Sequence, residues 1–219
     1  SFLYADRGET GKVREAARDW QDYLEKYNPQ DSAFNTANEA YHLGWIDLAE
    51  GRPESVKTHI EEIGKLLPRL APSDYEIMSW RRLLLGAEAA LARNATDEAI
   101  KIGEKIVFGP LQSVHTANVA PYNTPFLKDV LARAYWKKGN LDKAIAEYER
   151  LTTIDPKSQL RLLIPPLYHY RLGRVLDQKG EKGRARSEYE KFLRYWADAD
   201  PRFVELKDAR ARLAALRDR

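Results

Sequence analysis

The sequence contains no cysteine, and this absence excludes disulfide frameworks, thiol nucleophiles and metal sites ligated by cysteine. It also lacks any run of about 18 apolar residues, the length that a helix needs to cross a membrane. The 36 lysine and arginine residues nearly balance the 33 aspartate and glutamate residues, so the net charge of +3 does not by itself indicate a nucleic-acid partner. What remains is a globular chain of 219 residues, which can bury a core without cross-links.

Patterns that support catalysis or metal binding are missing as well. No histidine has a second histidine at metal-ligand spacing on one helix face. Serine and threonine residues lack the nucleophile-elbow context of hydrolases, and no glycine-rich loop follows a strand. We therefore expect a protein that is not an enzyme and that needs no cofactor and no metal. The four histidines are His42, His59, His115 and His169.

A repeated pattern of small, turn and aromatic residues is the strongest feature that is present. Its clearest copy, residues 131–156, has two amphipathic segments joined by a short turn, and Ala144 and Tyr148 follow that turn. Asparagine replaces glycine at one turn, and both residues tolerate a left-handed backbone. The copies recur every 40 to 45 residues, and their turn residues are Gly11, Gly51, Asn94, Gly139 and Gly180.

This periodicity predicts helical hairpins along one domain that spans residues 1–219. Small residues such as Gly44 and Gly173 are expected to let helices approach closely, and Pro53 suits the first turn of a second helix. The last segment is amphipathic and is expected to cover the end of the array. The predicted parts are a partial repeat at 1–29, repeats at 35–70, 75–107, 125–156 and 166–197, a long linker at 108–124, and a capping helix at 201–217.

On these residues the chain resembles the tetratricopeptide repeat family, which shares the Leu-Gly, turn glycine, alanine, aromatic and proline pattern of residues 131–156. The resemblance implies an all-α fold, a right-handed α-solenoid of antiparallel helix pairs with a C-terminal capping helix. Because the spacing exceeds the family's usual period of about 34 residues, HEAT-type helical repeats stay an alternative.

The end of the chain carries a second resemblance. Residues 170–176, together with Phe203 to Leu216, are similar to the C-terminal end of tetratricopeptide arrays in bacterial signalling and regulatory proteins. The chain begins at Ser1 without the residue order of a signal peptide. We expect a docking or regulatory part of a larger bacterial protein, placed in the cytoplasm with the periplasm left open.

The first helix of each predicted hairpin carries a second stripe of residues at a constant offset from the turn. In the tetratricopeptide family such stripes line a concave groove, so the resemblance implies a protein or peptide partner bound there. The alternative is that Tyr41, Trp45 and Trp136 pack against neighbouring units. The predicted groove residues are Asn38, Tyr41, Trp45, Arg81, Glu88, Asp129, Arg133, Trp136, Tyr170, Arg171, Arg174 and Asp177.

The chemistry of the C-terminal half of this groove predicts its ligand. Arg133 and Arg174 share one offset and lie near Trp136 and Tyr170 in the pattern, which favours an acidic-aromatic peptide or an acidic helix. Reversing both charges is expected to leave the helix content unchanged and to weaken binding. The family's carboxylate clamp for chaperone tails is not expected, because Tyr41 and its equivalents replace the clamp's lysine and asparagine.

Two further function classes stay open. Residues 157–219 contain 16 basic and 9 acidic residues, so a nucleic-acid or transcription-regulator-associated module could use this basic end. An enzyme with its site in the insertion 108–124 is the third class. We rank both below a protein-binding scaffold.

Overall fold

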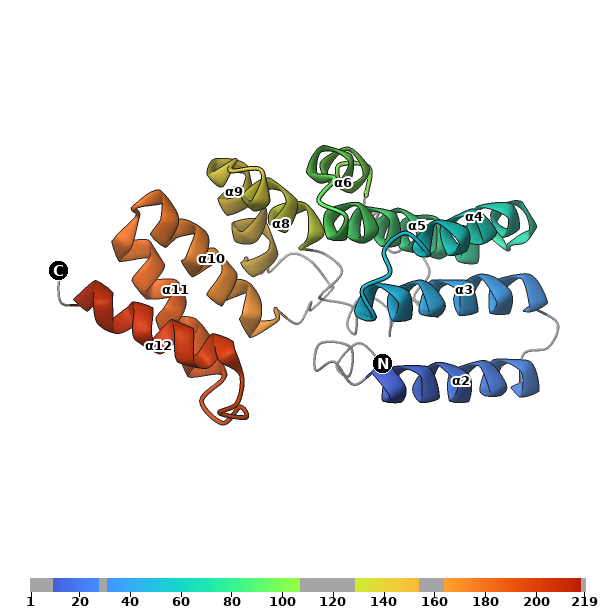
Figure 1. Ribbon diagram of the computed structural model, residues 1–219, viewed down its shortest axis with the longest axis horizontal. Coiled ribbons are helices and arrows are strands. Elements are labelled where there is room, and N and C mark those ends of the chain that lie inside the picture. Colours follow the sequence, from blue (N-terminus) through green and yellow to red (C-terminus); the bar gives the residue numbers. More distant parts are fainter. Residues whose placement is uncertain (1–9, 28–30, 107–128, 154–163, 218–219) are drawn as a thin grey trace. The chain divides into compact units, whose positions relative to one another are not determined.

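The computed structural model describes four stretches of the chain, and every regular element in them is a helix (Figure 1). The predicted all-α fold is therefore confirmed, and within the described residues the helices follow one another as an α-solenoid. The predicted linker 108–124 and His115 lie outside these stretches. The structure describes residues 10–27, 31–106, 129–153 and 164–217.

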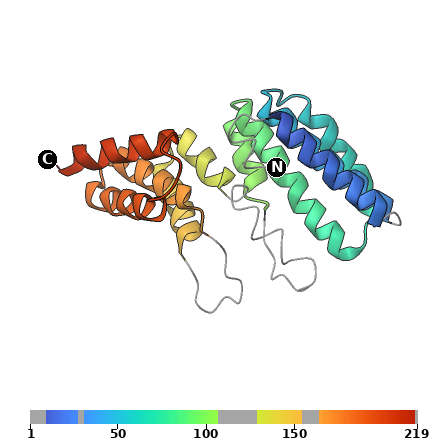
Figure 2. The same cartoon turned by 90° about the horizontal axis from the view of Figure 1, so that it is seen from below.

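The chain divides into two compact units, residues 1–113 and 114–219. In unit 1, α2 packs on α3, and the hairpin of α3 and α4 packs on α5 (Figure 2). The single continuous domain expected from the sequence stays a prediction. The helices of unit 1 are α2 (Thr10–Tyr27), α3 (Ser32–Ala49), α4 (Val56–Leu66), the 3-10 helix η2 (Leu67–Arg69), α5 (Pro72–Ala92) and α6 (Thr96–Gly103).

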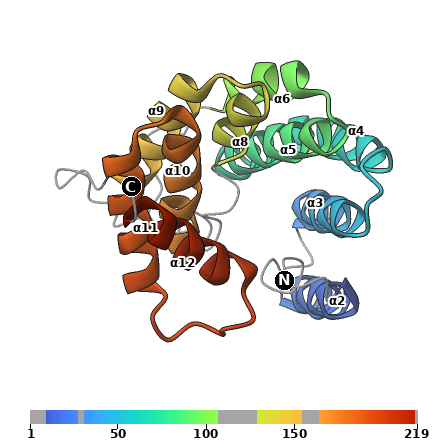
Figure 3. The same ribbon diagram turned by 60° about the vertical axis from the view of Figure 1, so that its left-hand side comes forward.

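In unit 2, α8 pairs with α9 and α10 pairs with α11, while α12 packs on α11 (Figure 3). Helix α12 buries Leu206, Ala209 and Leu213, which leave 1%, 0% and 9% of their surface exposed. The apolar side of α12 therefore covers the last hairpin. The helices are α8 (Val130–Lys137), α9 (Leu141–Thr152), α10 (Pro166–Lys179), α11 (Lys182–Tyr195) and α12 (Val204–Arg217).

Four of the predicted turn residues have the left-handed backbone that ends a first helix. In each case the next residue donates its N–H to the carbonyl five positions earlier, as Glu181 does to Leu176 at 2.9 Å. Glycine accepts this conformation without strain because it has no Cβ. The four residues and their φ angles are Gly51 (73°), Asn94 (64°), Gly139 (82°) and Gly180 (86°).

Two local expectations from the sequence are wrong. Gly11 lies in the first turn of α2, which begins at Thr10, and its φ is not positive. Pro53 lies three residues before α4, which begins at Val56 after a turn. Proline does open α5 at Pro72, where its missing N–H leaves no hydrogen bond unmade.

Small residues set the distance between packed helices. A Cβ on Gly173 would lie 2.8 Å from Cε1 of Tyr189, whose side chain is fully buried on α11. This approach closes the hairpin of α10 and α11, as predicted. Gly44 serves a different pair of helices, because a Cβ there would meet Leu85 of α5 and not a residue of α4.

The aromatic residues of α2 are more exposed than their counterparts in unit 2. Trp20 and Tyr23 leave 47% and 52% of their surface exposed, and their rings stack at 5.5 Å between centroids. Tyr189 and Phe192, at the same offsets in the last repeat, are fully buried against α10. Helix α2 packs on α3 and leaves both of these aromatic side chains partly exposed.

Two further properties concern the described helices as a set. None of them has both the length and the apolar character needed to cross a membrane. All peptide bonds between described residues are trans.

Replacing Gly173 with alanine tests the close approach of α10 and α11. We expect G173A to lower the free energy of unfolding by about 1–3 kcal/mol, because the buried Tyr189 ring must move. The matched control is G86A on α5, where a Cβ would lie 3.7 Å from its nearest neighbours. G86A should be neutral or stabilising by about 0.5–1 kcal/mol through helix propensity. Urea denaturation followed by circular dichroism measures both, and equal effects would contradict the predicted packing.

Candidate functional site

The predicted groove residues fall into two groups, one in each unit. The group of unit 1 lies on α3 and α5, and the group of unit 2 lies on α8, on α10 and at the residue just before α8. Each group is described by itself, and one groove along both units stays a prediction. Unit 1 holds Asn38, Tyr41, Trp45, Arg81 and Glu88, and unit 2 holds Asp129, Arg133, Trp136, Tyr170, Arg171, Arg174 and Asp177.

In unit 1, Arg81 of α5 lies against two residues of α3. Its Nη1 donates to Oδ1 of Asn38 at 2.8 Å, and its guanidinium carbon lies 5.1 Å from the centroid of the Tyr41 ring. Tyr41 in turn meets the Trp45 ring edge-on at 6.3 Å. Tyr41 and Asn38 leave only 1% and 3% of their surface exposed, so both belong largely to the interface of α3 and α5.

Burial changes the titration of two residues in this group. Burial raises the pKa of the Tyr41 hydroxyl well above its usual range, although the charge of Arg81 opposes the effect. Burial and the charge of Arg81 together lower the pKa of His42 to about 4. Both side chains are therefore neutral at pH 7. Glu88 is also buried, with 9% of its surface exposed.

In unit 2, a buried carboxylate binds two of the predicted groove arginines. Asp129 is fully buried, and its Oδ1 accepts from Nε of Arg133 at 2.9 Å. Its Oδ2 accepts from Nη1 of Arg171 and, at 3.4 Å, from the hydroxyl of Tyr148. Although burial by itself would raise the pKa of Asp129, the two guanidinium groups hold it below its usual range. This cluster ties α8, α9 and α10 together.

The Asp129 cluster corrects the predicted effect of charge reversal. We expected R133E to leave the helix content unchanged, but Arg133 neutralises a buried carboxylate. A glutamate at this position would place a second negative charge beside Asp129 and leave that charge uncompensated. This ion pair argues against that expectation for Arg133, which pairs with a buried carboxylate.

Arg174 and Tyr170 join a second polar network that reaches α12. The Tyr170 hydroxyl donates to Oδ2 of Asp208 at 2.8 Å, and Nη1 of Arg174 donates to the Tyr170 oxygen at 3.0 Å. Arg212 donates to Asp208 at 2.7 Å and to Asp177 at 3.0 Å. Asp208 and Arg212 belong to the predicted capping helix and are not among the predicted groove residues. The four-residue spacing of Asp208 and Arg212 is visible in the sequence. Their contacts with Tyr170 and Asp177 of α10, however, depend on how α12 packs.

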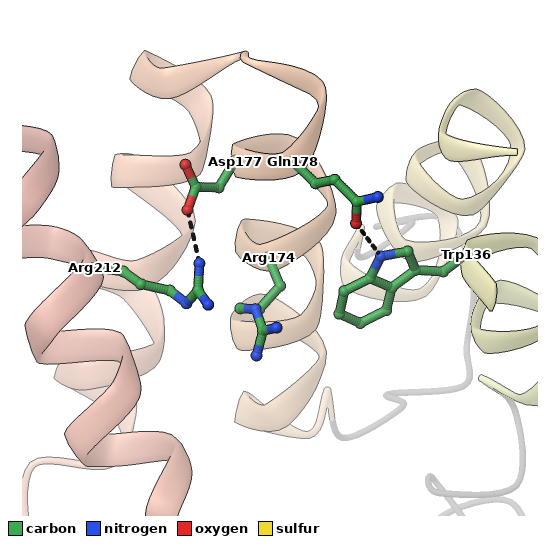
Figure 4. A pocket seen from close by; sticks show the side chains of 5 residues that line it. All are labelled: Trp136, Arg174, Asp177, Gln178 and Arg212. Atoms are coloured by element: carbon green, nitrogen blue, oxygen red, sulfur yellow. Dashed lines mark hydrogen bonds and ion pairs between the residues drawn. The ribbon is translucent and has the colours of Figure 1, made fainter. Parts of the chain in front are cut away.

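Residues of α8, α10 and α12 surround an open hollow of about 320 Å³ (Figure 4). Trp136 forms one wall, and its Nε1 donates to Oε1 of Gln178 at 2.7 Å. The guanidinium carbon of Arg174 lies 5.6 Å from the centroid of the Trp136 ring. Figure 4 shows Arg174 between Trp136 and Arg212. The hollow thus combines one aromatic face with charged and amide groups.

Other titratable groups in the described residues form pairs inside the repeats. Nδ1 of His169 lies 2.7 Å from Oε2 of the buried Glu188, which also binds Lys191 at 2.5 Å. Nε2 of His59 lies 3.0 Å from Oδ2 of Asp47. Within the described stretches, no three histidine, aspartate or glutamate side chains come together as metal ligands do.

The fold and this surface define a class of protein, the helical-hairpin repeat scaffolds. The sequence model of one family within this class, the tetratricopeptide repeat, matches residues 129–158 and 167–195. The match covers two of the repeats predicted from the sequence and supports the resemblance to this family. A search among curated proteins gives no match. Tetratricopeptide repeats are in general modules for protein–protein interaction.

The Asp129 cluster predicts a specific loss of stability. We expect D129N to lower the free energy of unfolding by about 3–5 kcal/mol, because two guanidinium groups lose their buried counter-charge. The control is D142N, since Asp142 is 81% exposed beside Lys179 and should contribute about 0–1 kcal/mol. Denaturant unfolding at pH 7 measures both variants, and similar losses would contradict the structural role.

The same cluster predicts the direction of a pH effect. Because the folded-state pKa of Asp129 is lowered, its contribution is present above the unfolded-state pKa of about 3.9 and is lost as pH falls through the folded-state value. The stability difference between wild type and D129N should therefore shrink as pH falls below about 4. Unfolding curves from pH 6 to pH 2 measure it. A difference that stays constant over this range would show that the Asp129 charge is not its source.

Proposed function

We propose that the chain is a non-catalytic scaffold that binds a segment of a partner protein at the hollow of unit 2. The observation that supports this best is the Trp136 ring, which forms an accessible wall beside the Arg174 cation. Tryptophan and arginine are enriched among residues that contribute most to protein–protein binding. An anchor side chain of a partner would gain contact area on the ring and hydrogen bonds at the rim.

The charges around the hollow indicate what kind of anchor it suits. Arg212 already pairs with Asp177 and Asp208, whereas Nη1 of Arg174 lies 3.5 Å from Asp208 and is held mainly by the Tyr170 oxygen. Two arginines and two aspartates therefore balance locally. We propose an aromatic or aliphatic anchor on Trp136, with a polar group of the partner bound by Arg174. Like the sequence pattern, this favours a peptide or a helix as ligand.

Two finer parts of the proposal come from the sequence. We propose that the scaffold is a docking or regulatory part of a larger protein, following the resemblance of its last 50 residues. The nucleic-acid alternative receives less support. Several arginines of the basic end bind carboxylates, as Arg184 does with Glu181 and Glu149.

A selection from a random peptide library tests the proposal. Peptides are selected on the immobilised chain, and their affinities are measured by fluorescence anisotropy for wild type and variants. We expect W136A to weaken binding by about 2 kcal/mol, or roughly thirtyfold, if Trp136 is a central contact. R174A should weaken it less, because its rim position keeps water nearby.

The control for this experiment is W20A, which removes an exposed tryptophan of unit 1. W20A should bind the selected peptides as wild type does. Equal binding by wild type and W136A would reject the hollow as the site. Preferential binding of an oligonucleotide, with affinity falling steeply in salt, would favour the nucleic-acid class instead.

A further inference from the structure

We infer that Arg81 and Asn38 form a receptor for a carboxylate side chain of the partner, separate from the hollow of unit 2. The inference rests on the proposed function, because it assigns a second contact of the same kind of ligand. The sequence pattern placed the acidic end of that ligand on Arg133 and Arg174. The structure satisfies Arg133 with Asp129 and leaves a different arginine without a counter-charge.

The free edge of Arg81 is the first observation. Nη1 of Arg81 is held by Asn38, with Sδ of Met78 at 3.7 Å. Nε is buried and has no hydrogen-bond acceptor, and Nη2 donates to no described residue. These two atoms form one edge of the planar guanidinium, the edge that binds both oxygens of a carboxylate. Among the described residues this edge therefore has no acceptor.

The missing counter-charge is the second observation. Among the described residues, no carboxylate lies within 4 Å of Arg81, whereas two other half-buried arginines have one. Arg93 pairs with Glu54 and Glu98, and Arg133 pairs with Asp129. Burial lowers the pKa of Arg81, which means that its charge loses solvation without an ionic partner. A bound carboxylate would supply that partner.

Asn38 gives the third observation. It leaves 3% of its surface exposed, and its Oδ1 is bound to Arg81, so the opposite side of the amide carries Nδ2. That Nδ2 is buried and has no acceptor. Two buried N–H groups without acceptors thus lie on one pair of side chains, which natural structures rarely leave unsatisfied. Asn38 acts as a positioning residue that holds Nη1 and leaves the opposite edge of Arg81 without an acceptor among the described residues.

The surroundings favour a carboxylate over other anions. Tyr41 covers one face of the guanidinium, and His42 is neutral at pH 7, so Arg81 is the only described cation at the site. One planar fork suits one planar carboxylate, whereas a phosphate dianion is held by several donors and charges. The positions of the family's chaperone-tail clamp are Tyr41, Trp45, Leu84 and Glu88, so the Arg81 receptor is a different site.

Titration with acetate, observed on the arginine Nε–H signals by NMR, tests the inference. The Arg81 signal is assigned by its loss in R81M. We expect it to move downfield and to saturate with acetate at constant ionic strength, while the Arg93 signal stays in place. N38A should weaken acetate binding about fivefold, the size of one net hydrogen bond. A linear shift equal to that of the exposed Arg202 would overturn the receptor, and tighter binding of inorganic phosphate would overturn the carboxylate assignment.

The double variant N38L/R81M separates binding from structure. If Asn38 and Arg81 serve to bind a ligand, replacing both polar side chains with apolar ones should leave the melting temperature unchanged or raise it. The double variant no longer contains the two buried N–H groups that lack acceptors. A fall of more than about 4 °C, equivalent to roughly 1 kcal/mol, would assign the pair to structure instead. R93M is the control, since it removes an arginine that already has carboxylate partners.

The two proposals fail separately. W136A should leave the acetate titration of Arg81 unchanged, because acetate needs no contact with the hollow. If selected peptides require Trp136 and bind R81M as tightly as wild type, the scaffold function stands and the carboxylate receptor is rejected. If acidic peptides lose at least fivefold affinity in R81M but not in R93M, the receptor stands whatever W136A does.

Discussion

The left-handed residue at the end of each first helix is the constraint on which the rest of the structure depends. At Gly139 and Gly180 the chain reverses within a few residues, and the next N–H closes a hydrogen bond to a carbonyl of the previous turn. The helix end is thereby satisfied, and the second helix starts in antiparallel contact with the first. Buried alanines and tyrosines on the second helix then meet small residues on the first, as Tyr189 meets Gly173.

The two units differ in how the charged side chains discussed above are paired. In unit 2, the buried Asp129 is neutralised by two arginines from different helices, and Arg212 bridges two aspartates. Such clusters specify which helices pack together, because a missing partner would leave a buried charge. In unit 1, the guanidinium of Arg81 contacts an amide oxygen, a thioether sulfur and aromatic rings, and no carboxylate of a described residue. An arrangement that does not favour stability is a reason to look for a ligand there.

The repeat register was predictable from one sequence, and the roles of individual groove residues were not. The offset from each turn correctly placed Asn38 and Arg81 on facing helices, because helical periodicity puts equivalent residues on equivalent faces. The same offset could not show that Arg171 reaches Asp129, 42 residues away. One signal was overlooked, since Asp129 and Arg133 are four residues apart and face the same side of a helix.

The sequence by itself determined the class of fold, four of the five predicted turn positions and the resemblance to a repeat family, because these follow from local backbone preferences and a repeated apolar pattern. The sequence did not determine the conformation of Gly11, which lies within helix α2 and not at a turn. The tertiary structure decided which charges are neutralised and which lack a counter-charge among the described residues. Whether an arginine such as Arg81 or Arg133 finds a carboxylate depends on which helices pack side by side, and that pairing joins residues far apart in the chain.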